Sequence, residues 1–202
     1  MKKAGKRKIA RVIRAVVPGL YEKGSVLATI PRRDILRGFC LETSAADRDG
    51  VYISTFVQPL YMPASCVVLS LGDRTGGGCR TWHIDDADEL AEAAKSAAPF
   101  FQAIDTASAI CEWHFLDGFR YGYCLQARAY SLILCGRAHE GAEALRRSIE
   151  ETKDDDRDWV REDSVRDEAL AALAESDPVS AVERLRSWAA ATAEALKITD
   201  IP

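Results

Sequence analysis

The hydrophobic pattern of the chain changes near residue 85, and this change limits the fold class. Between residues 26 and 84, short runs rich in β-branched and aromatic residues are separated by glycine, proline and aspartate turns. After residue 85, apolar residues recur every three or four positions, which is the spacing of a helix that buries one face. A run of strands followed by a run of helices predicts an α+β fold, in which the helices pack on the sheet.

The first half is expected to hold one helix and a small sheet. Over residues 3–20, apolar side chains such as Ile9 and Ile13 form a single stripe, and the helix ends at Pro18-Gly19. Four strand candidates follow, and the short turns between them favour an antiparallel meander. These strands are expected at residues 35–42, 51–58, 66–71 and 80–84.

The second half is expected to be helical throughout. Asp177-Pro178, for example, combines an N-cap with a proline at the first helical position. The expected helices cover residues 87–98, 106–116, 123–135, 138–152, 159–175 and 178–197. We expect a single domain over residues 1–202, made of a helix plus sheet (1–84) and a helical half (85–202).

The bulk composition is that of an ordinary globular protein. The chain has 202 residues, of which 48% are apolar and 29% are charged. No stretch approaches the roughly 18 uninterrupted apolar residues of a membrane span. The apolar residues near the N-terminus are interrupted by Arg11 and Arg14, so they do not form the core of a secretory signal. We therefore expect a cytoplasmic protein.

The six cysteines do not have the spacing of a metal site. No two of them are separated by two residues, the arrangement that lets one turn hold a zinc ion. Cys111 and His114 lie three apart on one helix face, but no second pair of ligands accompanies them. Four cysteines lie in apolar runs: Cys40, Cys66, Cys124 and Cys135. We expect reduced thiols that act as small hydrophobic residues in the core, and no metal or cofactor.

A small hydrolase-like active site is one alternative function. His83 and Asp85 would share one strand face, with Arg74 in the preceding loop, and an imidazole beside a carboxylate suits general-base catalysis. Helix capping by the aspartates and ordinary strand alternation explain the same residues without catalysis. The glycine-rich segment 72–78 lacks the following helix of a phosphate-binding loop, so a flexible hairpin loop is the simpler interpretation.

Charge is distributed unevenly along the chain. Residues 1–38 contain eleven Lys/Arg and two acidic residues, a net charge of +9; because the whole chain carries −4, the remainder carries −13. Residues 140–177 hold fourteen acidic and six basic residues. Such a surface attracts a basic macromolecule. The residues predicted to contact that partner are Asp154, Asp155, Asp156, Asp158, Trp159 and Glu162.

The basic N-terminal segment has three interpretations. As a nucleic-acid site it would use Lys2, Lys3, Lys6, Arg7 and Lys8. In a structural role, its apolar stripe docks on the sheet while the lysines stay in water, and the lack of nearby aromatic residues for base stacking favours this role. In a third arrangement, the segment lies against the acidic helices of its own subunit or of a neighbouring copy in a homo-oligomer.

Two resemblances point to protein binding. Residues 125–148 carry the large and small residues of one tetratricopeptide-type helical hairpin, including Leu125, Ala129, Leu132 and Gly141, and such hairpins serve as protein-binding surfaces. The order of basic helix, meander and acidic helical half resembles small bacterial immunity and antitoxin proteins. These resemblances imply a non-catalytic protein-binding module, such as an immunity or defence-system protein, that docks a macromolecular partner through its acidic helices.

Overall fold

The computed structural model confirms the predicted α+β architecture: a helix, a four-stranded antiparallel sheet, and then helices. It describes residues 3–29, 34–45, 47, 49–78, 80–118 and 122–198.

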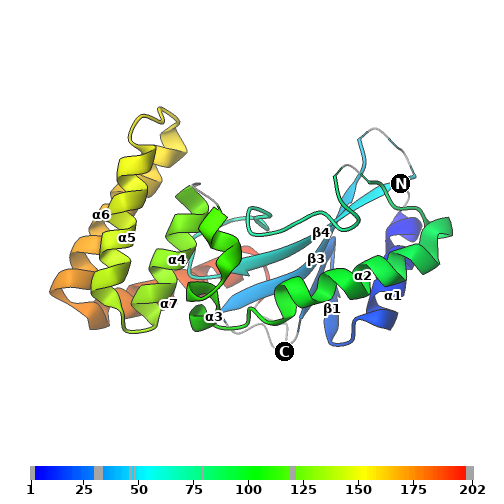
Figure 1. Ribbon diagram of the computed structural model, residues 1–202, viewed down its shortest axis with the longest axis horizontal. Helices are drawn as coiled ribbons and strands as arrows, with labels where there is room; N and C mark the ends of the chain where they lie inside the picture. Colours follow the sequence, from blue (N-terminus) through cyan, green and yellow to red (C-terminus); the bar gives the residue numbers. More distant parts are fainter. Residues whose placement is uncertain are drawn as a thin grey trace. The chain divides into compact units, whose positions relative to one another are not determined.

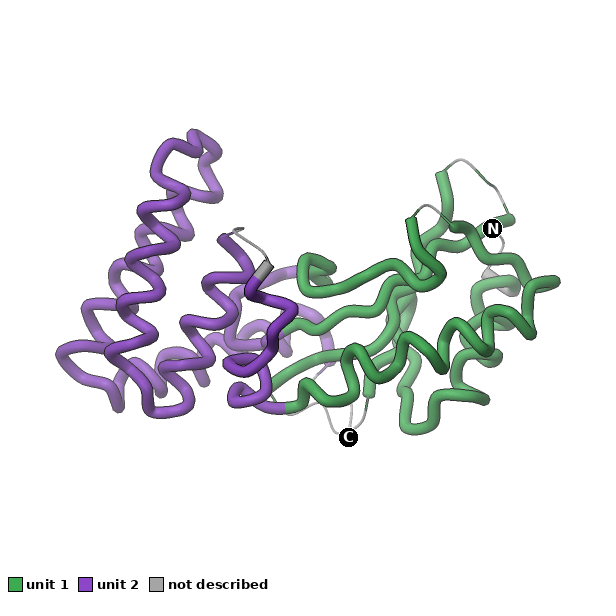
Figure 2. Tube along the Cα trace, in the orientation of Figure 1, with its two compact units in different colours: residues 1–58, 67–105, 199–202 green, residues 59–66, 106–198 purple. Residues whose placement is uncertain are grey.

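Figure 2 shows the chain divided into two compact units. The first unit holds residues 1–58, 67–105 and 199–202, and the second holds residues 59–66 and 106–198. The division falls after residue 105, whereas the sequence pattern places it after residue 84. A single domain over the whole chain stays a prediction.

The first unit contains α1 (Lys3–Val16) and the sheet, whose strands lie in the order β1-β2-β3-β4. The strands are β1 (Leu20–Lys23), β2 (Val26–Thr29), β3 (Ile35–Thr43) and β4 (Val51–Pro59). β1 and β2 form a hairpin in which Lys23 pairs with Val26. The two-residue turn between them begins with Gly24 at a φ of 63°, a conformation that glycine adopts without strain.

The sheet uses partly different segments from those predicted. The β1–β2 hairpin is absent from the sequence prediction, and the strands predicted at 66–71 and 80–84 do not form. Instead, residues 71–75 run along β4 through three backbone hydrogen bonds of 2.8 to 2.9 Å. Trp82 forms an isolated antiparallel bridge with Val51, also in β4. Both segments pair with β4 over too few residues to form strands.

Glycine residues determine where the 71–75 segment runs. A Cβ atom on Gly72 would lie 2.1 Å from the carbonyl oxygen of Thr55 in β4, so only glycine permits this close approach. The three glycines at 76–78 all have positive φ and form the turn that ends the segment. The predicted hairpin loop at 72–78 therefore has two parts. Residues 72–75 run along β4, and residues 76–78 form a glycine turn.

Helix α2 (Ala87–Gln102) belongs to the first unit and packs against α1 and β3 (Figure 1). It follows a short 3-10 helix, η1 (Ile84–Asp86), and continues through Pro99, where the sequence predicts a break. The fully buried ring of Phe101 packs edge-to-face on Phe39, with 5.1 Å between the ring centres. We attribute the extra helical turn to this contact, because burial of the ring offsets the hydrogen bond that proline cannot donate.

The second unit is an array of helices. It contains α3 (Ala107–Cys111), η2 (His114–Gly118), α4 (Gly122–Leu134), α5 (Ala138–Thr152), α6 (Asp158–Ser176) and α7 (Pro178–Ala195). α4 and α5 form the predicted helical hairpin, α5 packs against α6, and α7 packs against both α4 and α6. α7 begins as predicted, since Asp177 accepts a hydrogen bond from the backbone N–H of Ser180 at 3.1 Å. Within the described residues, every helix is too short or too polar to cross a bilayer.

Candidate functional site

Helix α6 carries apolar side chains on two faces. One face, which includes Val160, Leu170 and Ala174, is buried inside the second unit. The other face carries Val165 and Leu173, and the Val165 side chain is 72% exposed. Helix α7 covers only part of this second face, and the Val165 side chain on it stays exposed.

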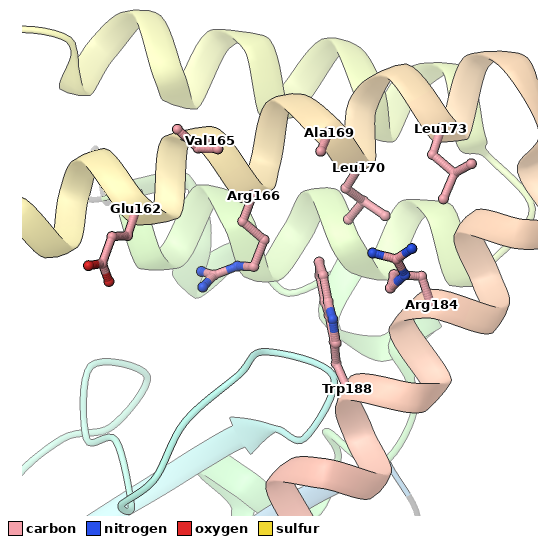
Figure 3. A pocket seen from close by; sticks show the side chains of 8 residues that line it. All are labelled: Glu162, Val165, Arg166, Ala169, Leu170, Leu173, Arg184 and Trp188. Atoms are coloured by element: carbon pink, nitrogen blue, oxygen red, sulfur yellow. The ribbon is translucent and has the colours of Figure 1, made fainter.

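A pocket of about 400 Å³ lies between this second face of α6 and helix α7 (Figure 3). Its lining residues are Glu162, Val165, Arg166, Ala169, Leu170 and Leu173 from α6, and Arg184 and Trp188 from α7. Figure 3 shows the indole of Trp188 between Arg166 and Arg184, with Glu162 at one end of the pocket. The α6–α7 pocket, as we call it, is therefore apolar along its wall and charged at its ends.

Glu162 connects this pocket with the predicted acidic surface. Trp159, Glu162 and Arg166 follow one another at intervals of three and four residues, so they lie on one face of α6. The side chain of Trp159 is 55% exposed, and the guanidinium of Arg157 lies 4.6 Å from its ring centre. Two of the predicted partner-binding residues, Trp159 and Glu162, therefore lie on the same helix face as the α6–α7 pocket, whereas Asp154, Asp155 and Asp156 precede the helix.

Local arginines neutralise two of the predicted partner-binding carboxylates. Arg157 forms an ion pair with Asp155 and lowers the pKa of that carboxyl to about 2. Arg161 lies 3.4 Å from Asp158, one turn away on α6. The predicted carboxylates with no ion pair among the described residues are Asp154, Asp156 and Glu162. These three carry the negative charge that is open to a partner.

A buried polar network lies beneath the pocket. Asp167 is 1% exposed, and its carboxylate accepts hydrogen bonds from Gln126 Nε2 at 2.7 Å and from the Tyr130 hydroxyl. Burial raises the pKa of Asp167, although the hydrogen bonds from Tyr130 and Gln126 work in the opposite direction. Burial and the neighbouring carboxylate also raise the pKa of Tyr130, so its hydroxyl keeps its proton and remains the donor.

This network holds two residues of the pocket in place. Arg166 Nε lies 3.5 Å from the Tyr130 hydroxyl, and one of its terminal nitrogens donates to Asp163 at 2.6 Å. The guanidinium lies 5.8 Å from the ring centre of Trp188, which in turn lies 5.7 Å from that of Tyr130. Arg166 and Trp188 are therefore preorganised, whereas Glu162 and Val165 extend from an exposed surface.

The structure does not bring the three candidate catalytic residues together. Arg74 lies over the ring of Tyr52 at 4.2 Å and lines a cavity of about 420 Å³ that neither His83 nor Asp85 lines. His83 Nε2 forms a 2.8 Å pair with a carboxylate oxygen of Asp47, and Asp85 is exposed in η1. The imidazole therefore has a carboxylate neighbour, but not the predicted one and not within the cavity that contains the arginine.

The basic N-terminal residues differ in their surroundings. The side chain of Lys6 is half-buried and donates to the carbonyl oxygen of Leu41 at 3.2 Å, while Arg7 and Lys8 are exposed. The apolar stripe is buried as predicted, including Ile9 and Ile13 in α1 and Val17 directly after it. Lys3 is the first residue of α1, and Lys2 lies outside the described residues. The arrangement matches the structural role of the segment, in which one face packs and the other meets water.

The apolar residues of the α6–α7 pocket are not among the site residues predicted from the sequence. Val165, Ala169 and Leu173 repeat every four residues, on a different face from the buried residues of α6. This second stripe was visible in the sequence and could have indicated an exposed apolar face. Trp188 and Arg184 carry no such signal, because their place opposite α6 depends on how α7 packs.

The described cysteines are reduced thiols, and two of the four that lie in apolar runs are buried as predicted, whereas the other two are exposed. Cys40 and Cys124 are buried, Cys111 is half-buried, Cys66 and Cys135 are exposed, and Cys79 lies outside the described residues. Cys135 follows the last residue of α4 directly, so the apolar run that contains it continues past the buried part of the helix. Among the residues that the structure describes, no three His, Cys, Asp or Glu side chains gather in a way that could hold a metal ion.

Comparison with protein-family models, with curated proteins and with solved structures found no match. The function proposed below therefore depends on the geometry and chemistry of the chain itself.

Proposed function

We propose that this protein is a non-catalytic binding module that docks a basic protein segment along one face of α6. The observation that carries the proposal is the continuity of two features on that face. The exposed Glu162 on α6 lines the α6–α7 pocket, whose wall includes the exposed Val165, and the open carboxylates of Asp154 and Asp156 lie in the loop that leads into α6. We call this surface the α6 docking strip.

The size of the strip favours a polypeptide over a small ligand. From Trp159 to Leu173 the helix rises about 21 Å, at about 1.5 Å per residue. A pocket of about 400 Å³ holds only one or two large side chains of such a partner. The rest of the contact would be polar and exposed, as is usual at the rim of a protein interface.

Affinity and specificity come from different parts of the strip. An apolar side chain that enters the pocket beside Trp188 contributes about 1.5–3 kcal/mol by burial. The open carboxylates steer a basic segment toward the pocket and select its orientation. Glu162 is suited to both roles, because it is exposed and also lines the pocket.

The narrower proposal is that the protein acts in the bacterial cytoplasm as an immunity or defence-system protein, and that its partner is a basic toxin or defence component. Two features support this class: the acidic helical surface, and the order of helix, sheet and helices along the chain. Co-expression with basic proteins encoded beside it in the genome tests the class directly. Protection of the host from one of them supports the proposal, and no effect from any of them contradicts this narrower part.

Affinity capture tests the docking strip itself. The wild-type protein, Glu162→Lys and Val165→Lys serve as baits in a nuclease-treated host lysate, and Asp88→Lys, a charge reversal at an exposed site on α2, serves as the matched control. We expect a basic protein on the wild-type and control baits, at least tenfold depleted on the other two and weakened by added salt. Equal recovery on all four baits contradicts the proposal, and recovery of the basic protein only from a parallel lysate without nuclease treatment indicates a nucleic-acid contact instead.

A further inference from the structure

The α6–α7 pocket keeps two charges of opposite sign open. Glu162 and Arg184 both line it, both are exposed, and neither forms an ion pair or a hydrogen bond with another residue that the structure describes. Arg166 differs from them, because its guanidinium already pairs with Asp163 at 2.6 Å. The pocket therefore offers one carboxylate and one guanidinium to a bound molecule.

These two charges lie at opposite ends of the pocket. α6 and α7 are joined by Asp177 alone, so the two helices come together at this residue. Leu173 lies four residues before Asp177 and Arg184 seven residues after it, whereas Glu162 lies fifteen residues before it. Figure 3 shows the helices close together beside Leu173 and Arg184 and farther apart towards Glu162. The pocket is therefore a wedge that is open at Glu162 and closed near Arg184.

This wedge fits the end of a polypeptide better than its middle. A chain that follows the wall from Glu162 towards Leu173 reaches the junction of the two helices and cannot continue between them. Its last residue then lies beside the guanidinium of Arg184, which attracts a carboxylate and repels an ammonium group. We therefore propose that the pocket binds the carboxyl terminus of the basic partner. This inference rests on the α6 docking strip and names the part of the partner that the strip recognises.

Each part of such a terminus meets a matching group. The last side chain packs on the apolar wall formed by Leu170, Leu173 and Trp188, and the terminal carboxylate accepts hydrogen bonds from Arg184. A volume of about 400 Å³ suits a large apolar last residue, such as leucine or phenylalanine. The indole of Trp188 already packs on Tyr130, with 5.7 Å between the ring centres, so little ordering is needed when the terminus binds.

The position of Glu162 determines where the partner carries its basic residue. Glu162 precedes Ala169 by seven residues and Leu173 by eleven, which is a rise of about 10 to 16 Å along α6. An extended chain covers this distance in about three to five residues, at about 3.3 Å per residue. We therefore expect a lysine or arginine three to five positions before an apolar carboxyl-terminal residue.

A pair of peptide libraries tests the need for a free carboxyl terminus. The random octapeptides are attached through their amino ends, and the two libraries differ only in ending in a carboxylate or in a carboxamide. We expect the labelled full-length protein to enrich the predicted sequences from the carboxylate library alone. In solution, measured by fluorescence anisotropy, the carboxamide of the best peptide should bind at least tenfold more weakly than the free acid.

Variants of Arg184 test the residue that the proposal assigns to the carboxylate. Arg184→Ala should weaken binding of the free acid at least tenfold and leave binding of the carboxamide unchanged, whereas Arg184→Lys should retain part of the affinity. Arg186→Ala is the matched control, because Arg186 is an exposed arginine on α7 that does not line the pocket. Thermal unfolding should show the same stability for all three variants, since both side chains are exposed.

The outcomes separate this inference from the proposed function. If both libraries yield the same sequences, and Glu162→Lys and Val165→Lys abolish their binding, the docking strip stands and capture of the terminus is wrong. Capture of the terminus is also overturned if neither library is enriched, or if Arg184→Ala binds the free acid as tightly as the wild type. Equal recovery on all baits in the lysate experiment overturns the docking strip itself, and this inference with it.

Discussion

At the scale of single residues, the buried carboxylate of Asp167 depends on hydrogen-bond donors from neighbouring side chains. A carboxylate that is almost fully buried is tolerated only where donors satisfy it, and here the donors come from Gln126 and Tyr130 on α4. We expect Asp167→Ala to lower the free energy of unfolding by about 3 kcal/mol, because it leaves two buried donors without an acceptor. Urea denaturation measures the change. A loss below about 1 kcal/mol would show that the two donors find water or new partners instead.

The protonation of Asp167 gives a second expectation at this scale. Because burial raises its pKa above the ordinary 3.8, the folded protein holds this proton more tightly than the unfolded chain does. The resulting stability is complete below the unfolded pKa and is lost as pH rises through the folded pKa. The variant Asp167→Asn has no carboxyl group to titrate, so it does not lose stability in this way as pH rises. Its stability relative to wild type should therefore improve as pH rises from about 4 to 7, measured by denaturation at each pH. A constant difference across that range would contradict the assigned pKa shift.

At the scale of elements, α6 offers a test that separates packing from binding. Val165 is 72% exposed, and Leu170, five residues along the helix and on its buried face, is 2% exposed. We expect Val165→Lys to change the free energy of unfolding by less than about 0.5 kcal/mol, as for most surface substitutions. Leu170→Ala should cost about 2–5 kcal/mol, because it leaves a cavity. Denaturation curves of the two variants make the comparison. If Val165→Lys were strongly destabilising, the second face of α6 would be structural and the docking strip would lose its support.

The α4–α5 hairpin depends on a glycine at the helix contact. A Cβ atom on Gly141 would lie 2.5 Å from Ile133 Cγ1 and 2.8 Å from the carbonyl oxygen of Ala129. We therefore expect Gly141→Ala to destabilise the protein by about 1–3 kcal/mol through overpacking. Gly122→Ala is the matched control, since among the described residues its Cβ would meet Thr152 Cγ2 alone, at an ordinary 3.5 Å. Thermal unfolding should separate the two variants, and equal melting temperatures would mean that the helices move apart without cost.

The helices of the second unit could be predicted from the sequence because their signals are local. The predicted ranges for α4 to α7 lie within two residues of the observed bounds, since apolar spacing and the Asp177-Pro178 start act within a few residues. The outer part of the sheet could not be predicted in this way. Residues 71–75 pair with β4 because Gly72 approaches the Thr55 carbonyl, a contact that depends on a distant segment. The acidic residues of the docking strip could be predicted because their charges are read directly from the sequence. The pocket could not, because it depends on how Trp188 packs.

At the scale of the molecule, the net charge overstates the acidity open to a partner. All six basic side chains of residues 140–177 form ion pairs with acidic side chains of the same segment: Arg146–Glu175, Arg147–Glu143, Lys153–Glu150, Arg157–Asp155, Arg161–Asp158 and Arg166–Asp163. Asp167 is buried, so its charge is withdrawn from the surface as well. A basic partner therefore meets isolated carboxylates instead of a continuous acidic surface, and this pattern supports a directed contact more than a diffuse attraction.

The helices of the second unit also depend on residues 59–66, which belong to the same unit but lie about forty residues before its first helix in the sequence. Tyr61 is fully buried in this unit, and its hydroxyl lies 2.6 Å from Ser131 Oγ on α4. We expect Tyr61→Ala to lower the free energy of unfolding by about 3–5 kcal/mol, as for other buried aromatic side chains. Tyr61→Phe keeps the ring and should cost only about 1 kcal/mol, the usual value of one hydrogen bond. Hydrogen exchange of the α4 amides should accelerate far more in the first variant. A fragment of residues 106–198 lacks this segment and should be less protected still; if its α4 amides exchange as slowly as in the full chain, residues 59–66 are not part of the core that stabilises these helices.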